Sequence, residues 1–333
     1  MKILYIYRHP GMGFSIGKVF RPIEEEMKKY AEVNSLELPC SNYSLRSMWK
    51  NIKAARKAVK SKKYDVIHIT GAEHYLLPFL SGQCTVVTVH DLGFFTNHKF
   101  GLRSIKKYFL WIQTLLWADY VTFISSKSEK EALRFVQLKE TKHSVVCNPV
   151  GSDFRPCSKK INTEKPVILH VGIKPNKNLE STAIALKGFP CKLRIIGELT
   201  EEQVLALKLY EIDYECVSKL SDEEIVQEYI NCDYVNFPSL YEGFGMPIIE
   251  GQAIGRPILT SNLSPMKEVA GDGAILVNPT SPEEIRKGYG RMKQQTDNLV
   301  ALGYVNVRRF SLGEITAQYL SVYKKSLQGC SVN

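Results

Sequence analysis

Two carboxylates, Glu242 and Glu250, stand eight residues apart on either side of a turn that contains two glycines. Glycine lets the backbone approach a ligand closely, because it has no side chain to hold the ligand away. Pro247 suits the first turn of a following helix, where its missing N–H costs nothing. Helix N-termini attract anions through unpaired N–H groups and the helix dipole. Residues 241–250 therefore predict an anion site with two acids placed to accept hydroxyls of the same ligand; a helix-capping carboxylate beside a plain turn is the alternative.

A second anion-binding segment is expected at residues 171–179, which follow an apolar run and open another helix. Lys177 lies near the N-terminus of that helix, where a cation is unfavourable unless an anion binds beside it. The segment therefore predicts a lysine that holds an anion, and an exposed basic turn is the alternative.

His90 and Asp91 follow the apolar run 85–89, so we expect them at the carboxyl end of a strand. Histidine can exchange a proton near neutral pH, and Asp91 can orient it or touch a ligand. His170 lies inside a strand and is expected in the core. Gly13, in the glycine-rich loop after the first strand, is a weaker candidate for contact with a phosphate. The spacing of that loop differs from the dinucleotide fingerprint, which disfavours a dehydrogenase.

Short β-branched runs alternate with helical patterns along most of the chain. Such alternation predicts an α/β protein whose parallel sheets are covered by helices on both faces. The expected strands are 2–7, 66–70, 85–89, 120–124, 144–147, 166–171, 192–196, 234–237, 257–259 and 274–277. The expected helices are 17–30, 43–62, 101–117, 127–136, 179–186, 221–230, 282–293 and 310–327.

Residues 148–165 interrupt this pattern with prolines, a glycine and adjacent lysines, which is typical of a linker. We expect an N-terminal domain over 1–150 and a C-terminal domain over 166–310, with a sheet of about five strands in each. The last helix, 311–330, is expected to pack on the N-terminal domain. Ligands of open α/β sheets bind at the carboxyl ends of the strands, so the cleft between the domains is the expected site.

The 333 residues are 44% apolar and 23% charged, which is an ordinary globular composition. The eight cysteines are scattered without zinc-ligand spacing, so we expect reduced thiols and no metal site. No apolar run reaches the roughly 20 residues that span a bilayer. The first residues are too short an apolar run for a signal peptide, and no cleavage site follows them. We therefore expect a cytoplasmic protein.

The positive charge is confined to the N-terminal half. Residues 1–150 carry 23 basic and 12 acidic side chains, whereas residues 151–333 carry 21 and 22. Basic residues of the expected helix 43–62 recur at helical spacing, at Lys50, Lys53, Arg56, Lys57 and Lys60. A solvated helix face is one interpretation, and an anionic membrane surface, on the inner face of the cell membrane, is another. A nucleic-acid partner is disfavoured, because no nucleic-acid-binding module accompanies the basic stretch.

The run Ser239–Glu250 resembles the E-x7-E signature of the family-4 retaining glycosyltransferases of GT-B fold, the group 1 glycosyl transferases of bacterial polysaccharide and glycan synthesis. The runs Gly255–Ile258 and Glu268–Gly271 match the same family pattern. The resemblance covers most of residues 85–330 well and the N-terminal third weakly. It implies two Rossmann-like, doubly wound parallel-sheet domains that face a cleft.

The resemblance also implies roles for the residues of the glycine-rich turn. Glu250 binds the ribose of a nucleotide, and Glu242 touches hydroxyls of the donor sugar. The backbone amides of Gly243, Phe244 and Gly245 hold the diphosphate.

Other roles carry over to the remaining candidates. Lys177 matches the lysine that stabilises the leaving diphosphate, and His90 matches the histidine that contacts the donor sugar. Gly13 lies in the loop placed against the diphosphate, and Asp91 is expected to contact the acceptor or orient His90.

The sequence departs from the family pattern at one cation. Members usually carry an arginine at one of two positions, which are Ile173 and Asn176 here. We expect Lys174 to replace that charge and Asn176 to lie beside the phosphate.

The function implied by the resemblance is a retaining, metal-independent transfer of a hexosyl unit from a nucleoside-diphosphate sugar to an acceptor hydroxyl, with no cofactor. The expected partners are the nucleotide-sugar donor and a glycan or lipid-linked sugar acceptor in cell-surface glycan assembly. Two alternatives stay open. One is a nucleotide-sugar epimerase of the same architecture, and the other is a catalytically degenerate homologue that only binds a nucleotide.

Overall fold

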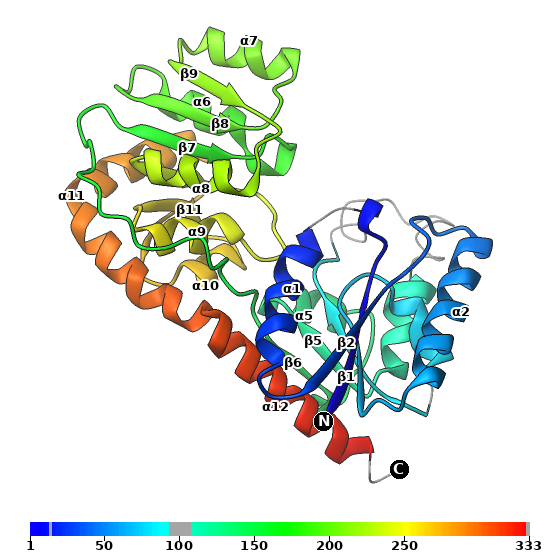
Figure 1. Ribbon diagram of the computed structural model, residues 1–333. Helices are drawn as coiled ribbons and strands as arrows, with labels where there is room; N and C mark the ends of the chain where they lie inside the picture. The colour runs from blue at the N-terminus through cyan, green and yellow to red at the C-terminus, as the bar shows by residue number, and fades with distance from the viewer. Residues whose placement is uncertain (13–14, 81, 93–107, 331–333) are drawn as a thin grey trace. The chain divides into compact units, whose positions relative to one another are not determined.

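The chain forms two compact units, each built on its own parallel sheet of six strands (Figure 1). The computed structural model describes residues 1–12, 15–80, 82–92 and 108–330. Unit 1 comprises Met1–Pro149 together with Leu312–Asn333, and unit 2 is the single segment Val150–Ser311.

The sheet of unit 1 has the strand order β2-β1-β3-β4-β5-β6. All its pairs are parallel, and its inner strands are buried on both faces, as β-branched and aromatic runs favour. The strands are β1 (Lys2–Tyr7), β2 (Glu32–Glu37), β3 (Val66–Ile69), β4 (Cys84–Val89), β5 (Tyr120–Phe123) and β6 (His143–Val145).

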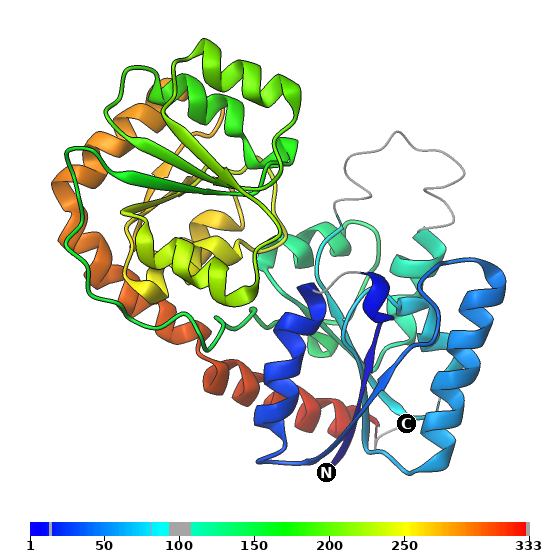
Figure 2. The ribbon, with the colours of Figure 1, turned by 45° about the horizontal axis from the view of Figure 1, so that its top comes forward.

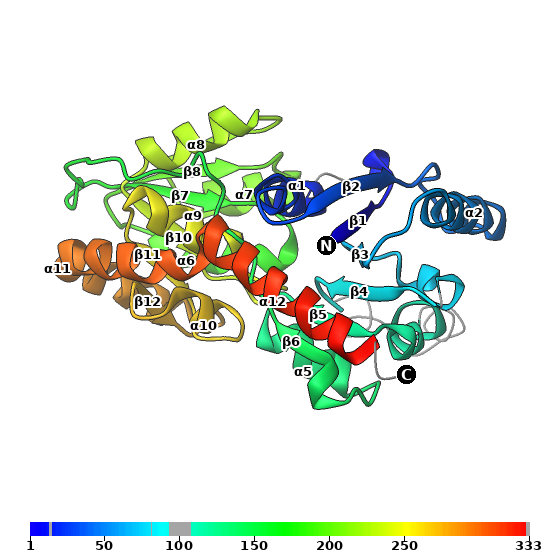
Figure 3. The ribbon, with the colours of Figure 1, turned by 60° about the horizontal axis from the view of Figure 1, so that its bottom comes forward.

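Helices cover both faces of this sheet. The helices α1 (Ser15–Met27) and α12 (Leu312–Cys330) pack against each other on one face. Figure 3 shows α12 running along the strands of unit 1. The other face carries α2 (Leu45–Ser61), α5 (Ser126–Leu133) and the short helices η2 (His74–Phe79), η3 (Tyr108–Ile112) and η4 (Gln113–Trp117).

A buried polar network fastens α12 to the sheet. The Tyr323 hydroxyl lies 2.7 Å from His68 Nδ1 and donates to the Tyr5 hydroxyl at 2.9 Å. The other ring nitrogen of His68 lies 2.8 Å from Thr88 Oγ1, which lies 3.3 Å from the Tyr319 hydroxyl. The end of the chain is therefore part of the unit that contains its beginning.

The sheet of unit 2 has the order β12-β11-β10-β7-β8-β9, again with parallel pairs. Read from β9, this is the strand order of the doubly wound dinucleotide-binding fold. The strands are β7 (Val167–Val171), β8 (Lys192–Ile196), β9 (Tyr214–Val217), β10 (Tyr234–Phe237), β11 (Ile258–Ser261) and β12 (Ala274–Val277).

Figure 2 shows the helices on the two faces of this sheet. The helices α6 (Leu179–Leu186), α7 (Glu201–Leu209) and α11 (Pro282–Val307) share the core of one face. On the other face, α8 (Asp222–Asn231), α9 (Met246–Ile254) and α10 (Met266–Ala270) pack beside one another. The remaining short helices are η1 (Pro10–Met12), η5 (Glu140–Lys142), η6 (Pro175–Lys177) and η7 (Arg308–Phe310).

The predicted α/β class and doubly wound parallel sheets are confirmed, but each sheet has six strands instead of about five. The two missed strands, β2 and β9, lie at the edges of their sheets and expose polar side chains such as Glu32 and Glu215. Neither therefore has the apolar run that is typical of a buried strand. The described part of the expected helix 101–117 is helical, but it forms a π-helix and a 3-10 helix in place of an α-helix. Within the described residues, no helix combines the length and the apolar character needed to cross a membrane.

Candidate active site

The two predicted anion-binding segments follow β7 and β10, the neighbouring strands at which the strand order of unit 2 reverses. The carboxyl ends of parallel strands lie on the same side of the sheet, so the segments that follow β7 and β10 meet there. Doubly wound sheets bind their ligands at this kind of reversal.

Lys177 and Glu242 form an ion pair across the reversal. The Lys177 Nζ lies 2.6 Å from Glu242 Oε1, and the two side chains are 18% and 15% exposed. The ammonium also lies 4.6 Å from the centre of the Phe237 ring, a cation–π contact. Gly172 makes room for the lysine stem: its φ is +89°, and a Cβ there would lie 3.2 Å from Lys177 Cγ. The structure thus brings together two of the predicted catalytic residues.

Asn176 ties the two segments to each other. Its side-chain amide donates to Glu242 Oε1 at 3.1 Å and to the Tyr241 carbonyl at 2.9 Å. Its own carbonyl accepts from the Leu240 amide at 2.8 Å. The asparagine therefore orients Glu242 in this structure. Lys174, which was expected to replace the missing arginine charge, has an exposed side chain.

Asn178 is a positioning residue that the sequence analysis missed. It adopts the left-handed conformation with a φ of 64°, which asparagine tolerates better than most residues. Its buried amide donates to the carbonyls of Pro238 and Pro279, at 3.1 and 2.6 Å. The side chain so holds the loops that follow β10 and β12 against the start of α6.

Glu250 lies on α9, which starts directly after Gly245. Gly245 has a φ of +120°, a conformation that side chains strongly disfavour. The Tyr229 hydroxyl donates to Glu250 Oε2 at 2.6 Å. Burial, followed by the Glu250 charge, raises the pKa of Tyr229 well above its usual value, so this hydroxyl stays a donor. Tyr229 comes from α8, and no spacing in the sequence could have linked it to Glu250.

The turn between the two acids offers backbone and little side chain. Phe244 is buried, with its ring 5.7 Å from that of Phe310 in an edge-to-face contact. Its side chain therefore belongs to the core, which leaves the backbone of Gly243, Phe244 and Gly245 ahead of the helix N-terminus. The anion-site prediction places the ligand against this stretch of backbone.

The remaining predicted site residues belong to unit 1. His90 follows β4, and its Nε2 lies 2.8 Å from the Thr70 carbonyl, so Nε2 carries a proton. Burial lowers the pKa of His90, which keeps the ring neutral at neutral pH and Nδ1 an acceptor. Asp91 is the next residue, and its negative charge opposes this effect by raising the pKa of His90. Gly13 lies outside the described residues. His170, as expected, is a core residue of unit 2.

Unit 1 also holds a buried acid that the sequence analysis missed. Glu73 lies in the segment after β3 and is 2% exposed. The Tyr43 hydroxyl donates to Glu73 Oε1 at 3.4 Å. Burial raises the pKa of Glu73 to about 7, although the positive charge of Arg8, which follows β1, acts to lower it. The strand order of unit 1 reverses between β1 and β3, so this acid too lies at a switch point.

Comparison with known families gives two adjoining matches. The family described as Glycosyl transferases group 1 matches residues 153–303, and the family described as Glycosyltransferase Family 4 matches residues 20–154. Together the matches run through both units.

Curated relatives show lower and more local similarity. The chain is 36% identical over 135 residues to MMP alpha-(1→4)-mannosyltransferase of Mycolicibacterium hassiacum, a match that covers 38% of this chain and 33% of that protein. It is 25% identical over 269 residues to O-antigen chain mannosyltransferase B of Escherichia coli, covering 72% and 70%. The chain thus spans only about a third of the length of the first of these relatives.

A solved structure shares the whole fold. HepE of Anabaena, solved in complex with UDP and glucose, superposes with a TM-score of 0.74 at 15% identity, over 97% of this chain and 99% of that one. At this identity the likeness establishes the GT-B architecture alone.

Proposed function

The chain belongs to the group 1 glycosyltransferases of GT-B fold, and we propose that it moves a hexosyl unit from a nucleoside-diphosphate sugar to an acceptor hydroxyl. The proposed reaction retains the anomeric configuration and needs no metal ion. The observation that carries the proposal is the Lys177–Glu242 pair at the strand reversal of unit 2, followed by the glycine-rich start of α9.

Each group of this site suits one part of a nucleotide sugar. The helix N-terminus and Lys177 would bind the diphosphate, because both favour negative charge. Glu250, held by Tyr229, would accept ribose hydroxyls, and Glu242 would accept hydroxyls of the sugar. Charge-assisted bonds of this kind contribute about 1.5–3 kcal/mol each.

The proposed chemistry breaks the bond between the anomeric carbon and the diphosphate oxygen and forms one to the acceptor oxygen on the same face. The departing phosphate oxygen takes the acceptor's proton. Lys177 and the backbone amides stabilise the charge that develops on the diphosphate, which is the work of preorganised donors in such sites. We propose that His90 contacts the donor sugar through its unprotonated Nδ1.

The donor class is tested by thermal-shift measurements with UDP, GDP, ADP and their sugars. We expect one nucleotide series to stabilise the wild type. With that donor, Glu242→Gln and Lys177→Ala should lower transfer by about 100-fold or more. Glu180→Gln and Lys187→Ala are matched controls, since both side chains are exposed on or beside α6.

Two outcomes contradict the proposal. One is wild-type transfer in both site variants. The other is conversion of the donor sugar without any acceptor, which would indicate an epimerase. Binding of nucleotide without either reaction, in the presence of lipid-linked and free glycan acceptors, would favour the degenerate homologue.

We further propose that unit 1 rests on an anionic membrane, where it meets a lipid-linked acceptor. Between Glu37 and Asp65 the chain has no acidic residue. The helix α2 presents Lys53, Arg56, Lys57 and Lys60 along a groove of about 600 Å³. Each lysine or arginine near an anionic bilayer contributes about 1 kcal/mol.

Apolar side chains accompany this charge. Trp49 lines the same groove and is 50% exposed, and its ring lies 6.3 Å from that of Phe79 in η2, which is also exposed. Leu116 and Trp117 in η4, which covers the same face of the sheet, are exposed too. Exposed aromatic residues beside basic ones favour the interfacial layer of a bilayer over a purely solvated surface.

A further inference from the structure

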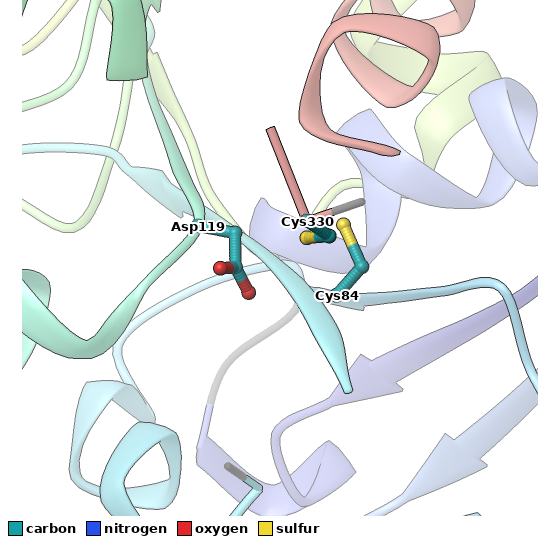
Figure 4. A group of neighbouring side chains, drawn as sticks. All are labelled: Cys84, Asp119 and Cys330. Atoms are coloured by element: carbon teal, nitrogen blue, oxygen red, sulfur yellow. The ribbon is translucent and has the colours of Figure 1, made fainter. Parts of the chain in front are cut away.

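Three potential metal ligands meet in unit 1, at the amino ends of its strands, whereas His90 follows the carboxyl end of β4. Cys84 is the first residue of β4, Asp119 directly precedes β5, and Cys330 is the last residue of α12. One ligand atom from each side chain lies within 4.8 Å of the other two (Figure 4). Cys84 is buried, and the other two are partly buried. The group lies at the amino ends of the strands and so takes no part in the proposed transfer.

We propose that Cys84, Asp119 and Cys330 bind a thiolate-preferring divalent cation, with zinc as the expected ion. Two thiolates and a carboxylate form a ligand set that zinc accepts, with Zn–S bonds of about 2.3 Å and Zn–O bonds of about 2.0–2.2 Å. Ligand atoms around a tetrahedral ion with such bonds lie roughly 3.5–4 Å apart, so a contraction of about 1 Å or less closes the present arrangement. A water molecule would complete the four-coordinate shell.

The carboxylate is already oriented by a neighbour of the first ligand. Asp119 Oδ2 accepts from the Thr85 amide at 2.8 Å and from the Thr85 hydroxyl at 3.0 Å. Hydrogen bonds of this kind hold a ligating carboxylate in place and support metal affinity. Thr85 is buried, so these bonds are shielded from water.

Metal binding fits this group better than a disulfide between the two cysteines. A disulfide would join the two sulfur atoms alone, whereas a metal ion would also bind the carboxylate that Thr85 orients.

The ion would join the last residue of α12 to two strands of the sheet. Val322, Tyr323 and Cys330 of α12 pack in one apolar cluster with β1, β3, β4 and α1. Bound zinc should therefore raise the thermal stability of unit 1, because it binds the folded arrangement and not the unfolded chain.

The experiment uses the full chain, stripped with a chelator and kept reduced. Cobalt(II) is titrated as a spectroscopic probe, because thiolate ligation gives it an intense near-ultraviolet charge-transfer band, and zinc is then added in competition. We expect one ion per chain in native mass spectra and a zinc-dependent rise in melting temperature. Cys330→Ser should abolish the band, and Thr85→Val, which removes only the orienting hydroxyl, should weaken binding by about 10-fold to 100-fold.

Cys216→Ser is the matched control, since Cys216 is an exposed cysteine on β9 of unit 2. An unchanged cobalt spectrum in Cys330→Ser, or a loss of the band in Cys216→Ser, overturns the proposal. So does a wild type that binds no cobalt or zinc while reduced, including one that forms a Cys84–Cys330 disulfide on mild oxidation. Because the readouts are metal binding and stability, the result is independent of the proposed transferase activity.

Discussion

Lys177 and Glu242 balance each other's charge at the proposed donor site while no ligand is bound. A half-buried lysine beside a helix N-terminus is unfavourable unless an anion lies near it. While no nucleotide sugar is bound, that anion is the Glu242 carboxylate. Binding of a diphosphate would move the lysine's charge to the phosphate and release the carboxylate for the sugar hydroxyls. The two residues are therefore coupled, so we expect the effects of the two substitutions to be smaller together than their sum.

Tyr229 should set the affinity for the nucleotide through Glu250. Tyr229→Phe removes the hydroxyl that donates to Glu250 Oε2 and leaves the ring packing in place. We expect the Kd of the nucleoside diphosphate to rise about 10-fold, equivalent to about 1.4 kcal/mol, which isothermal titration can measure. Tyr289→Phe is the control, because it removes a buried hydroxyl that donates to Asn236 instead. Equal losses of affinity in both variants would refute the positioning role.

Glu73 should make the stability of unit 1 depend on pH. Its pKa in the folded protein, about 7, lies above the ordinary 4.5. A raised pKa means that the folded state favours the protonated form. The contribution is therefore fully present below about pH 4.5 and is lost as the pH rises through 7.

The matched variant for this test is Glu73→Gln, which cannot ionise. From about pH 5 to about pH 8, the free energy of unfolding of the wild type should fall relative to that of the variant by up to about 3 kcal/mol. Urea unfolding of both proteins at several pH values measures this difference in the free energy of unfolding. Parallel curves for the two proteins would show that Glu73 has an ordinary pKa.

At the scale of elements, the strand-to-helix segments around the site could be predicted from the sequence. Gly243, Gly245 and Pro247 encode the turn and the start of α9 locally, so the prediction needed no tertiary information. Tyr229 and Asn178 could not be found in this way, because their partners lie on other elements and only the fold brings them together. The edge strands were missed for a related reason: β2 and β9 are held by pairing with a neighbour and not by an apolar pattern of their own.

The basic helix α2 carries the prediction about the membrane. Lys53→Gln combined with Lys57→Gln should lower the partition coefficient onto phosphatidylglycerol vesicles by about 30-fold, since each charge contributes about 1 kcal/mol. Co-sedimentation at low salt measures the effect, and it should fade at high salt as screening increases. Lys130→Gln with Lys139→Gln is the control, because these lysines are exposed in unit 1 but lie outside α2. Vesicle binding that is absent, or equally weakened by both pairs, excludes α2 as the docking face.

At the scale of the molecule, the two units differ in how the chain builds them. Unit 2 is one continuous segment that holds β7–β12 and the groups proposed for the donor. Unit 1 needs both ends of the chain, because α12 covers one face of its sheet and supplies the Tyr319 and Tyr323 hydroxyls to its buried polar network. The segment 148–165 was expected to link two domains, and in the structure the chain passes between the units at Pro149–Val150 and again at Ser311–Leu312.

This difference predicts opposite fates for two fragments. Residues 150–311 should fold alone and bind the nucleoside diphosphate with a Kd within about 10-fold of the full chain, because Lys177, Glu242, Glu250 and Tyr229 are all present. Residues 1–149 should not fold, since without α12 they expose the apolar surface that Ile315, Tyr319 and Tyr323 bury. Circular dichroism, thermal unfolding and calorimetric titration distinguish these outcomes. If the larger fragment folds but binds no nucleotide while the full chain does, nucleotide binding requires residues of unit 1, and the assignment of the nucleotide-binding groups to unit 2 is wrong.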